Sequence, residues 1–190
     1  MRVNRIIVPK SIKGKELDVL FFSDQHIGSK DCDLEKVKEY IDWVKKTPNV
    51  IVLMLGDTVS CGLRTSVGSG SYDDVMNTDR QIELAIELLM PIRKKIYGIH
   101  NGNHSNRIYN DTTLNPEKTI AQALGVPYLG DSCFHYLRFG DQTYSLYTTH
   151  GSTGSTTVTG ALQACMKCAG NNDADVFAYA HTHHLANVSQ

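Results

Sequence analysis

The side chains best suited to chemistry in this 190-residue sequence lie in five short clusters of Asp, Asn and His. Each cluster follows an apolar stretch that reads as a β-strand. In chain order the clusters are Asp24-Gln25-His26, Gly56-Asp57, Asn101-Gly102-Asn103-His104, His150-Gly151 and His181-Thr182-His183-His184. They offer carboxylate, amide and imidazole ligands without a thiolate, a set that suits Mn, Fe, Zn or Ni.

The clusters hold enough ligands for two divalent metal ions that share a bridging carboxylate. In open α/β sheets, ligands gather beyond the carboxyl ends of the strands, so five such ends pointing the same way would bring the clusters together. Two ions about 3.5–4 Å apart can hold a hydroxide between them and bind two oxygens of a phosphoryl group. The sequence therefore predicts a dinuclear site suited to hydrolysis of a phosphate ester.

The segments between the clusters predict the elements that position them. Apolar runs predict strands over residues 17–23, 50–55, 95–100 and 175–180, with a hairpin over 134–139 and 142–149. Apolar residues at helical spacing predict a helix after the N-cap Asp33 and a long helix that contains Ile82, Ala85, Ile86 and Leu89. Further helices are predicted from Pro116 and over Thr159 to Ala169. Strands alternate with helices early and the hairpin comes late, so the predicted fold is α/β with a mixed sheet.

The composition predicts one globular domain over residues 1–190. Hydrophobic residues make up 41% of the chain, charged residues 21%, and the formal net charge is −1. This balance gives no global basic field for nucleic acid, and no apolar run approaches the ~20 residues that span a bilayer. Five cysteines, an odd number scattered through the chain, predict reduced thiols in a cytoplasmic protein without a membrane partner.

Taken together, the five clusters resemble the signature of the calcineurin-like metallophosphoesterase superfamily. That signature reads D-x-H, G-D-x-x-D, G-N-H-D/E, H and G-H-x-H, and the matching segments follow the same order from Asp24 to His183. The resemblance implies a mixed-sheet β-sandwich flanked by helices. Members of the superfamily generally continue into further strands, whereas this sequence ends at Gln190, which predicts either a minimal version or a fragment that lacks C-terminal strands.

The resemblance also implies a role for each matching residue. The implied metal ligands are, for the first ion, Asp24, His26 and His183, for the second ion, Asn103, His150 and His181, and for both ions the bridging Asp57. His104 would contact the substrate and protonate the leaving oxygen, which is worth about 10²–10⁴-fold in rate. Arg107 is a candidate clamp for phosphate oxygens, with a solvated surface arginine as the alternative.

Two positions that usually support the catalytic histidine differ from the superfamily pattern. Ser60 stands where G-D-x-x-D often ends in aspartate, and Ser105 stands where a carboxylate follows G-N-H. Without a carboxylate partner, His104 has less help in staying charged. The sequence therefore predicts a complete set of metal ligands beside a less well supported general acid. His100 and His135 lie in strand-like segments outside every motif and are expected to be structural.

The function predicted from these motifs is phosphodiester hydrolysis, by a nuclease or a nucleotide phosphodiesterase that uses a metal-bridging hydroxide. The choice of a diester depends on the polar, glycine-rich segments 62–71 and 151–157 and on the lack of a protein-phosphatase signature beyond the shared core. A phosphomonoesterase or protein phosphatase with the same metals is the near alternative. A non-catalytic scaffold subunit is the distant one, favoured by the surroundings of His104 and opposed by seven metal ligands.

Overall fold

A computed structural model describes residues 2–9, 16–64, 66, 70–155 and 157–186 of the chain. The helices in this part are α1 (Leu34–Lys46), η1 (Gly70–Asp73), α2 (Thr78–Leu89), η2 (Met90–Lys95), α3 (Asn103–Thr112), α4 (Pro116–Leu124) and α5 (Val158–Gly170). The strands are β1 (Arg2–Ile7), β2 (Asp18–Phe22), β3 (Val50–Met54), β4 (Ile96–His100), β5 (Tyr128–Gly130), β6 (Ser132–Phe139), β7 (Gln142–Thr149) and β8 (Val176–Tyr179). The predicted α/β class is confirmed.

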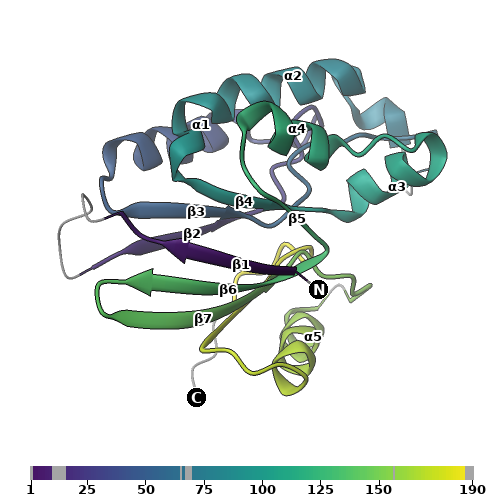
Figure 1. Ribbon diagram of the computed structural model, residues 1–190. Coiled ribbons are helices and arrows are strands. Elements are labelled where there is room, and N and C mark those ends of the chain that lie inside the picture. The colour runs from purple at the N-terminus through teal and green to yellow at the C-terminus, as the bar shows by residue number, and fades with distance from the viewer. Residues whose placement is uncertain (1, 10–15, 65, 67–69, 156, 187–190) are drawn as a thin grey trace.

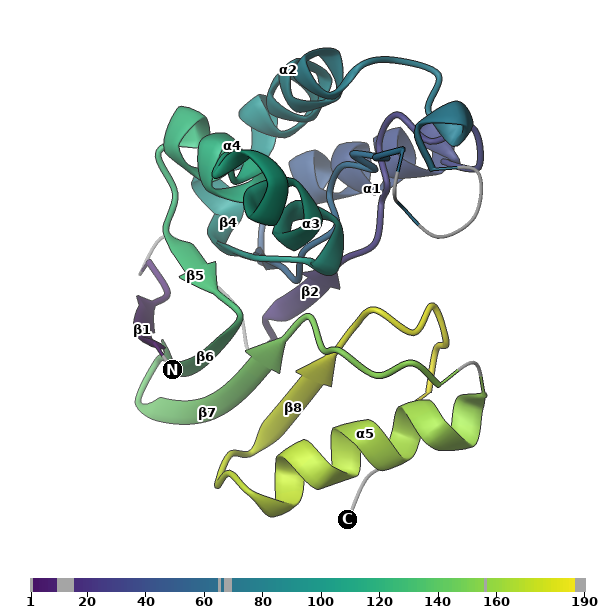
Figure 2. The same cartoon turned by 90° about the vertical axis from the view of Figure 1, so that its right-hand side faces the viewer.

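The strands form two sheets that lie between layers of helices (Figure 1). One sheet has the order β2-β3-β4-β5, and all its strands run parallel. The other sheet has the order β1-β6-β7-β8 and is mixed. Strands β6 and β7 form an antiparallel hairpin, whereas β1 pairs in parallel with β6 and β8 pairs in parallel with β7. Helices α1 to α4 cover the outer face of the parallel sheet, and α5 lies beside the mixed sheet, near β8 (Figure 2).

Strand β3 shows why the molecule is layered. All five of its residues are buried, as expected for an internal strand with both faces covered. Its side chains alternate between the faces, so Val52 and Met54 pack with the helices while Ile51 and Leu53 pack with the mixed sheet. Two apolar cores therefore share this strand, and its position fixes where the following Gly56-Asp57 segment emerges.

Most elements confirm the predictions from the sequence. Helix α1 begins at the expected N-cap, because the Asp33 side chain accepts a hydrogen bond from the Lys36 N–H. Helix α4 begins after Asn115 and ends at Gly125, which has a φ of 70°. The elements that were not predicted include the edge strand β1, the three-residue strand β5 and helix α3. Each carries a weak apolar pattern, and α3 has only Ser105 and Ile108 buried.

Some sequence features fall partly outside the described residues. The segment 62–71 includes residues 65 and 67–69, and the segment 151–157 includes residue 156, none of which the structure describes. All five cysteines are free thiols. Within the described part of the chain, no helix is both long and apolar enough to cross a membrane.

Two buried histidines join the sheets through one hydroxyl. His100 on β4 and His135 on β6 are fully buried, and their Nε2 atoms lie 2.6 and 2.7 Å from the Thr148 hydroxyl oxygen on β7. The other ring nitrogen of His100, Nδ1, lies 2.9 Å from the carbonyl oxygen of Gly130. Burial lowers the pKa of each imidazole to about 4. Both therefore act as neutral structural groups, as expected from the sequence.

The low pKa of these histidines predicts that acid destabilises the fold. Between about pH 6.5 and pH 4 the unfolded chain binds more protons than the folded one, so stability present above this window is lost as the pH falls through it. Each buried histidine contributes on the order of 1–2 kcal/mol to that loss at pH 5. Urea unfolding of the metal-free protein at pH 7 and pH 5 measures the effect, and His100→Asn should reduce the difference. An identical difference in wild type and variant would contradict this assignment.

Candidate metal centre

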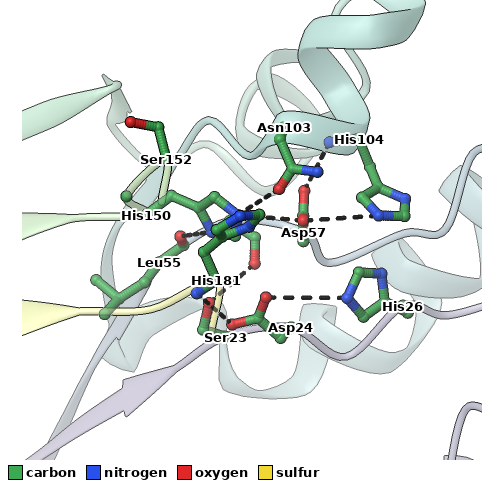
Figure 3. A network of polar contacts seen from close by, with 12 residues as sticks. Ser23, Asp24, His26, Leu55, Asp57, Asn103, His104, His150, Ser152 and His181 are labelled. Carbon is green, nitrogen blue, oxygen red and sulfur yellow. Dashed lines mark hydrogen bonds and ion pairs between the residues drawn. The ribbon is translucent and has the colours of Figure 1, made fainter. Parts of the chain in front are cut away.

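Five strands deliver the Asp, Asn and His clusters to one edge of the two sheets. Strands β2, β3 and β4 run parallel, so the segments that follow them emerge on the same side. Strands β7 and β8 are also parallel, with Thr149 opposite Tyr179, so His150 and His181 leave that sheet together. Figure 3 shows the resulting convergence of side chains from both sheets. The expected gathering of strand ends is therefore observed.

Backbone hydrogen bonds hold the first two clusters beside each other. The N–H of Asp24 donates to the carbonyl of Gly56 at 3.1 Å, and the N–H of His26 donates to the carbonyl of Asp57 at 3.0 Å. The N–H of Ile27 then donates to the carbonyl of Thr58 at 2.9 Å. These bonds continue the parallel pairing of β2 and β3 beyond the sheet. They fix Asp24 and His26 relative to Asp57 independently of the side chains.

The backbone conformation of these clusters is unusual. Among the described residues, seven non-glycine residues have a positive φ: Asp24, His26, Asp57, Cys61, Thr113, His181 and His183. Five of the seven are predicted metal ligands. A positive φ is costly for residues with a side chain, and it persists where the surrounding structure over-determines it, commonly at functional sites. The strain therefore gathers where the sequence predicts the chemistry.

The first donor group consists of Asp24, His26 and His183. The Oδ1 atom of Asp24 lies 3.8 Å from His26 Nε2 and 3.4 Å from His183 Nε2, and the two Nε2 atoms are 3.3 Å apart. Asp24 Oδ2 accepts a hydrogen bond from the His181 N–H, whereas the buried Oδ1 has no hydrogen-bond partner among the described residues. One lone carboxylate oxygen and two imidazole nitrogens thus face a common point.

The second donor group consists of Asp57, His150 and His181, with Asn103 beside them. His150 Nε2 lies 3.1 Å from Asp57 Oδ2 and 2.9 Å from Asn103 Oδ1. The other ring nitrogen, Nδ1, lies 2.8 Å from the Leu55 carbonyl oxygen and donates to it, which leaves Nε2 directed at the donor group (Figure 3). Such a hydrogen bond fixes the tautomer and orientation of a metal-binding histidine.

Asp57 lies between the two donor groups and is almost completely buried. Its Oδ1 accepts a hydrogen bond from the His104 N–H at the start of α3, and its Oδ2 faces His150. The segment just before α3 passes close to this carboxylate, and a Cβ on Gly102 would lie 2.0 Å from Asp57 Oδ1. A glycine is therefore required at position 102. Asp57 belongs to two of the three candidate donor groups, and the bridging role that the resemblance implies for it stays a prediction.

The charges within the centre are coupled. Burial opposes ionisation of Asp24, but contacts with His183 and Ser23 outweigh it and lower the pKa of Asp24 to about 2. Burial likewise opposes ionisation of Asp57, and the hydrogen bond and charge of His150 outweigh it, so the pKa of Asp57 is lowered. The pKa of His150 is raised because the contact with Asp57 outweighs the effect of burial. Both carboxylates are thus ionised at neutral pH and available as ligands.

The spacing of the donor atoms fits divalent metal ions. Ligand atoms that lie about 2.0–2.2 Å from one ion in tetrahedral or octahedral geometry are about 3–3.6 Å apart from each other. The closest donor distances here are 2.9–3.4 Å, and each group's ligand atoms lie within 4.8 Å of one another. Imidazole, carboxylate and amide donors suit borderline and hard ions. The buried Asp and His clusters can therefore hold metal.

His104 lies beside these groups and faces the Asp57 carboxylate that belongs to them. Its Nδ1 contacts the carbonyl oxygen of Ser60, and its Nε2 lies 3.9 Å from Asp57 Oδ2. Ser60, which stands where the superfamily pattern has aspartate, thus provides a backbone acceptor for the His104 ring. The sequence did not predict this contact. Burial lowers the pKa of His104, opposed by the charge of Asp57. Ser105 is fully buried, and its hydroxyl has no hydrogen-bond partner among the described residues.

The structure adds one residue that the sequence did not indicate. Glu117 on α4 is fully buried, and its carboxylate accepts hydrogen bonds from the Thr58 N–H at 2.7 Å and the Thr58 hydroxyl at 2.9 Å. Burial raises the pKa of Glu117 to about 7. Because Thr58 directly follows Asp57, these bonds hold the strained peptide that carries the central carboxylate. Glu117 follows a helix-initiating Asn-Pro pair, so its sequence context indicated only a helix start.

Comparisons with known proteins add no assignment to this geometry. No family model matches the chain, and no curated protein matches it in sequence. The interpretation therefore depends on the motifs and on the arrangement of the donor atoms.

The contacts of Glu117 predict that it supports metal binding through Thr58. Glu117→Ala removes both acceptors and should weaken Mn²⁺ binding about 10- to 100-fold, the range typical for groups that orient metal ligands. Glu117→Gln keeps the volume and an acceptor oxygen and should restore most of the affinity. Isothermal titration with Mn²⁺ measures this, with Glu35→Ala on the exposed start of α1 as the control. A lower melting temperature with unchanged Mn²⁺ affinity would show that Glu117 only stabilises the fold.

Proposed function

We propose that this protein belongs to the calcineurin-like metallophosphoesterase superfamily and hydrolyses phosphodiesters with two bound divalent metal ions. The observation that carries the proposal is a chain of three overlapping donor groups. The third group, His26, Asp57 and His104, shares His26 with the first donor group and the buried Asp57 with the second. The donors come from the five segments that resemble the superfamily signature. The two stacked sheets with helices on their outer faces are compatible with its sandwich fold.

The protein residues would divide the work between holding metal and handling the substrate. Two divalent ions bound by these donors would supply Lewis-acid stabilisation of the phosphoryl oxygens and a lower pKa for water. Asp57 would bridge them, held in place by the His104 N–H and by Glu117 through Thr58. The hydrogen bond from His150 Nδ1 to Leu55 would keep Nε2 directed at the metal.

His104 is the proposed proton donor to the leaving oxygen. Its Nδ1 is engaged by the Ser60 carbonyl, so Nε2 is the ring atom left for the substrate. Burial lowers the pKa of His104, and the charge of Arg107 adds to that effect. An anionic phosphoryl group bound beside the ring would raise the pKa again and favour the charged, proton-donating form. Substrate binding would thus add to the support that the Asp57 carboxylate gives to the charged ring.

Arg107 is the proposed clamp for phosphate oxygens. It lies one turn along α3 from His104, is partly buried and has no hydrogen-bond partner for its Nε among the described residues. A guanidinium group close to His104 suits forked binding of the phosphate oxygens of a substrate. Arg64, the other arginine near a ligand-bearing segment, is exposed.

The proposed substrates are nucleotide or nucleic-acid diesters, and the proposed setting is cytoplasmic. The polar, glycine-rich segments 62–71 and 151–157 beside the ligand-bearing clusters support an extended substrate. The five free cysteines support a reducing compartment.

Hydrolysis of paired chromogenic esters tests the proposal. The protein is stripped of metal, reloaded with Mn²⁺ and assayed with bis(p-nitrophenyl) phosphate and p-nitrophenyl phosphate. We expect metal-dependent turnover of the diester, lost in Asp57→Asn and reduced on the order of 10²- to 10⁴-fold in His104→Ala. Tyr109→Ala, on the exposed side of the same helix, should retain activity and serves as the control.

Other outcomes of this assay would favour the alternatives. Turnover of the monoester alone would support a phosphomonoesterase or protein phosphatase. Bound Mn²⁺ without turnover of either ester would support a non-catalytic scaffold, in which His104, with serines at positions 60 and 105, is too poorly supported to act as the general acid.

A further inference from the structure

A cavity of about 450 Å³ lies beside the first donor group, between the end of β2 and the start of α1. Its lining includes all three residues of that group, Asp24, His26 and His183, and no residue of the second group. Its volume lies within the roughly 300–1,000 Å³ of small-molecule sites. A substrate whose phosphoryl group lies at the first donor group can therefore extend one substituent into the cavity.

One wall of the cavity is apolar and aromatic. Phe22, Val37 and Tyr40 line it, and the rings of Phe22 and Tyr40 lie 5.8 Å apart. Tyr40 stands on α1 and is 42% exposed, and the ammonium group of Lys36 lies over its ring at 5.7 Å from the centroid. An aromatic side chain in this setting suits a flat ring, because stacking adds to the burial of apolar surface.

The charges around the cavity do not suit a second phosphate. Among the described residues that line it, Lys36 is the one lysine or arginine, and its ammonium group pairs with Glu39 at 2.6 Å. Asp31 and Asp33 also line the cavity and would repel an anion. The substituent that fits is therefore planar and without negative charge.

Gln25 supplies a polar group that lacks a partner. It lines the cavity and is only 7% exposed, yet neither its amide oxygen nor its amide nitrogen has a hydrogen-bond partner among the described residues. A buried polar atom without a partner costs about 1–3 kcal/mol, so such atoms are usually paired with protein, water or ligand. Both amide atoms are buried beneath the cavity wall, so the Gln25 side chain must turn to present them to a ligand. Once turned, the amide would offer a donor and an acceptor side by side, which matches the edge of a nucleobase.

We propose that this cavity is the subsite for the nucleobase of a nucleotide ester, with Tyr40 covering one face of the base and Gln25 recognising its edge. The position of the phosphoryl group depends on the proposed phosphoesterase function. The recognition of the base does not, because it uses residues outside both donor groups.

Binding of nucleoside monophosphates compared with ribose 5-phosphate tests the subsite without requiring turnover. In isothermal titration of the Mn²⁺-loaded protein, at least one of AMP, GMP, CMP and UMP should bind about 10-fold or more tightly than ribose 5-phosphate, as stacking on an aromatic residue provides. Tyr40→Ala should remove most of this preference. Gln25→Met, which keeps the volume but removes the amide, should reduce it about 3- to 10-fold.

Trp43→Ala is the matched control, since Trp43 also stands on α1 and is also 42% exposed but does not line the cavity. It should retain the preference for the nucleotide. Equal affinity of all four nucleotides and ribose 5-phosphate in the wild type would overturn the subsite, as would a preference that survives both Tyr40→Ala and Gln25→Met.

These outcomes separate the subsite from the proposed activity. A base preference without turnover of any phosphate ester would reject the phosphoesterase function and retain the subsite. Ester turnover without a base preference would retain the function and reject the subsite.

Discussion

The position of one buried carboxylate, that of Asp57, is the constraint on which the rest of the site depends. Its two oxygens face in different directions, one toward the His104 N–H and the other toward the His150 ring. A charge this deeply buried is unfavourable unless hydrogen bonds and opposite charges compensate it. The surrounding histidines and the start of α3 provide that compensation in the protein itself, and divalent ions would provide much more.

The packing of the two sheets holds the segment that carries this carboxylate in place. Strand β3 is buried on both faces, so it can anchor the Asp57 segment against helices on one side and the mixed sheet on the other. Glu117 reaches this segment from α4, and the His150 hydrogen bond to Leu55 reaches it from the mixed sheet. The Thr148 hydroxyl, shared by His100 and His135, joins the sheets just before His150. Packing and polar contacts thus converge on the same few residues.

The sequence predicted the parts of this structure that depend on local pattern. Apolar runs and capping residues predicted β3, α1 and α4. The position of each motif after a predicted strand indicated that the seven predicted ligands lie at one edge of the sheets. The sequence could not predict contacts that depend on tertiary packing. Glu117 looks like an ordinary acidic residue in the first turn of a helix, and its contact with Thr58 spans 59 positions. Likewise, the serine at position 60, where the superfamily pattern has aspartate, predicted a less well supported His104, whereas the structure shows a contact between the His104 ring and the Ser60 carbonyl.

Anomalous diffraction from crystals of the Mn²⁺-loaded protein tests the central claim most directly. Two manganese peaks about 3.5–4 Å apart are predicted. One should lie against Asp24, His26 and His183, the other against Asn103, His150 and His181, with Asp57 touching both. A single peak, or peaks away from the Asp57 carboxylate, would contradict the dinuclear centre on which the proposed chemistry depends.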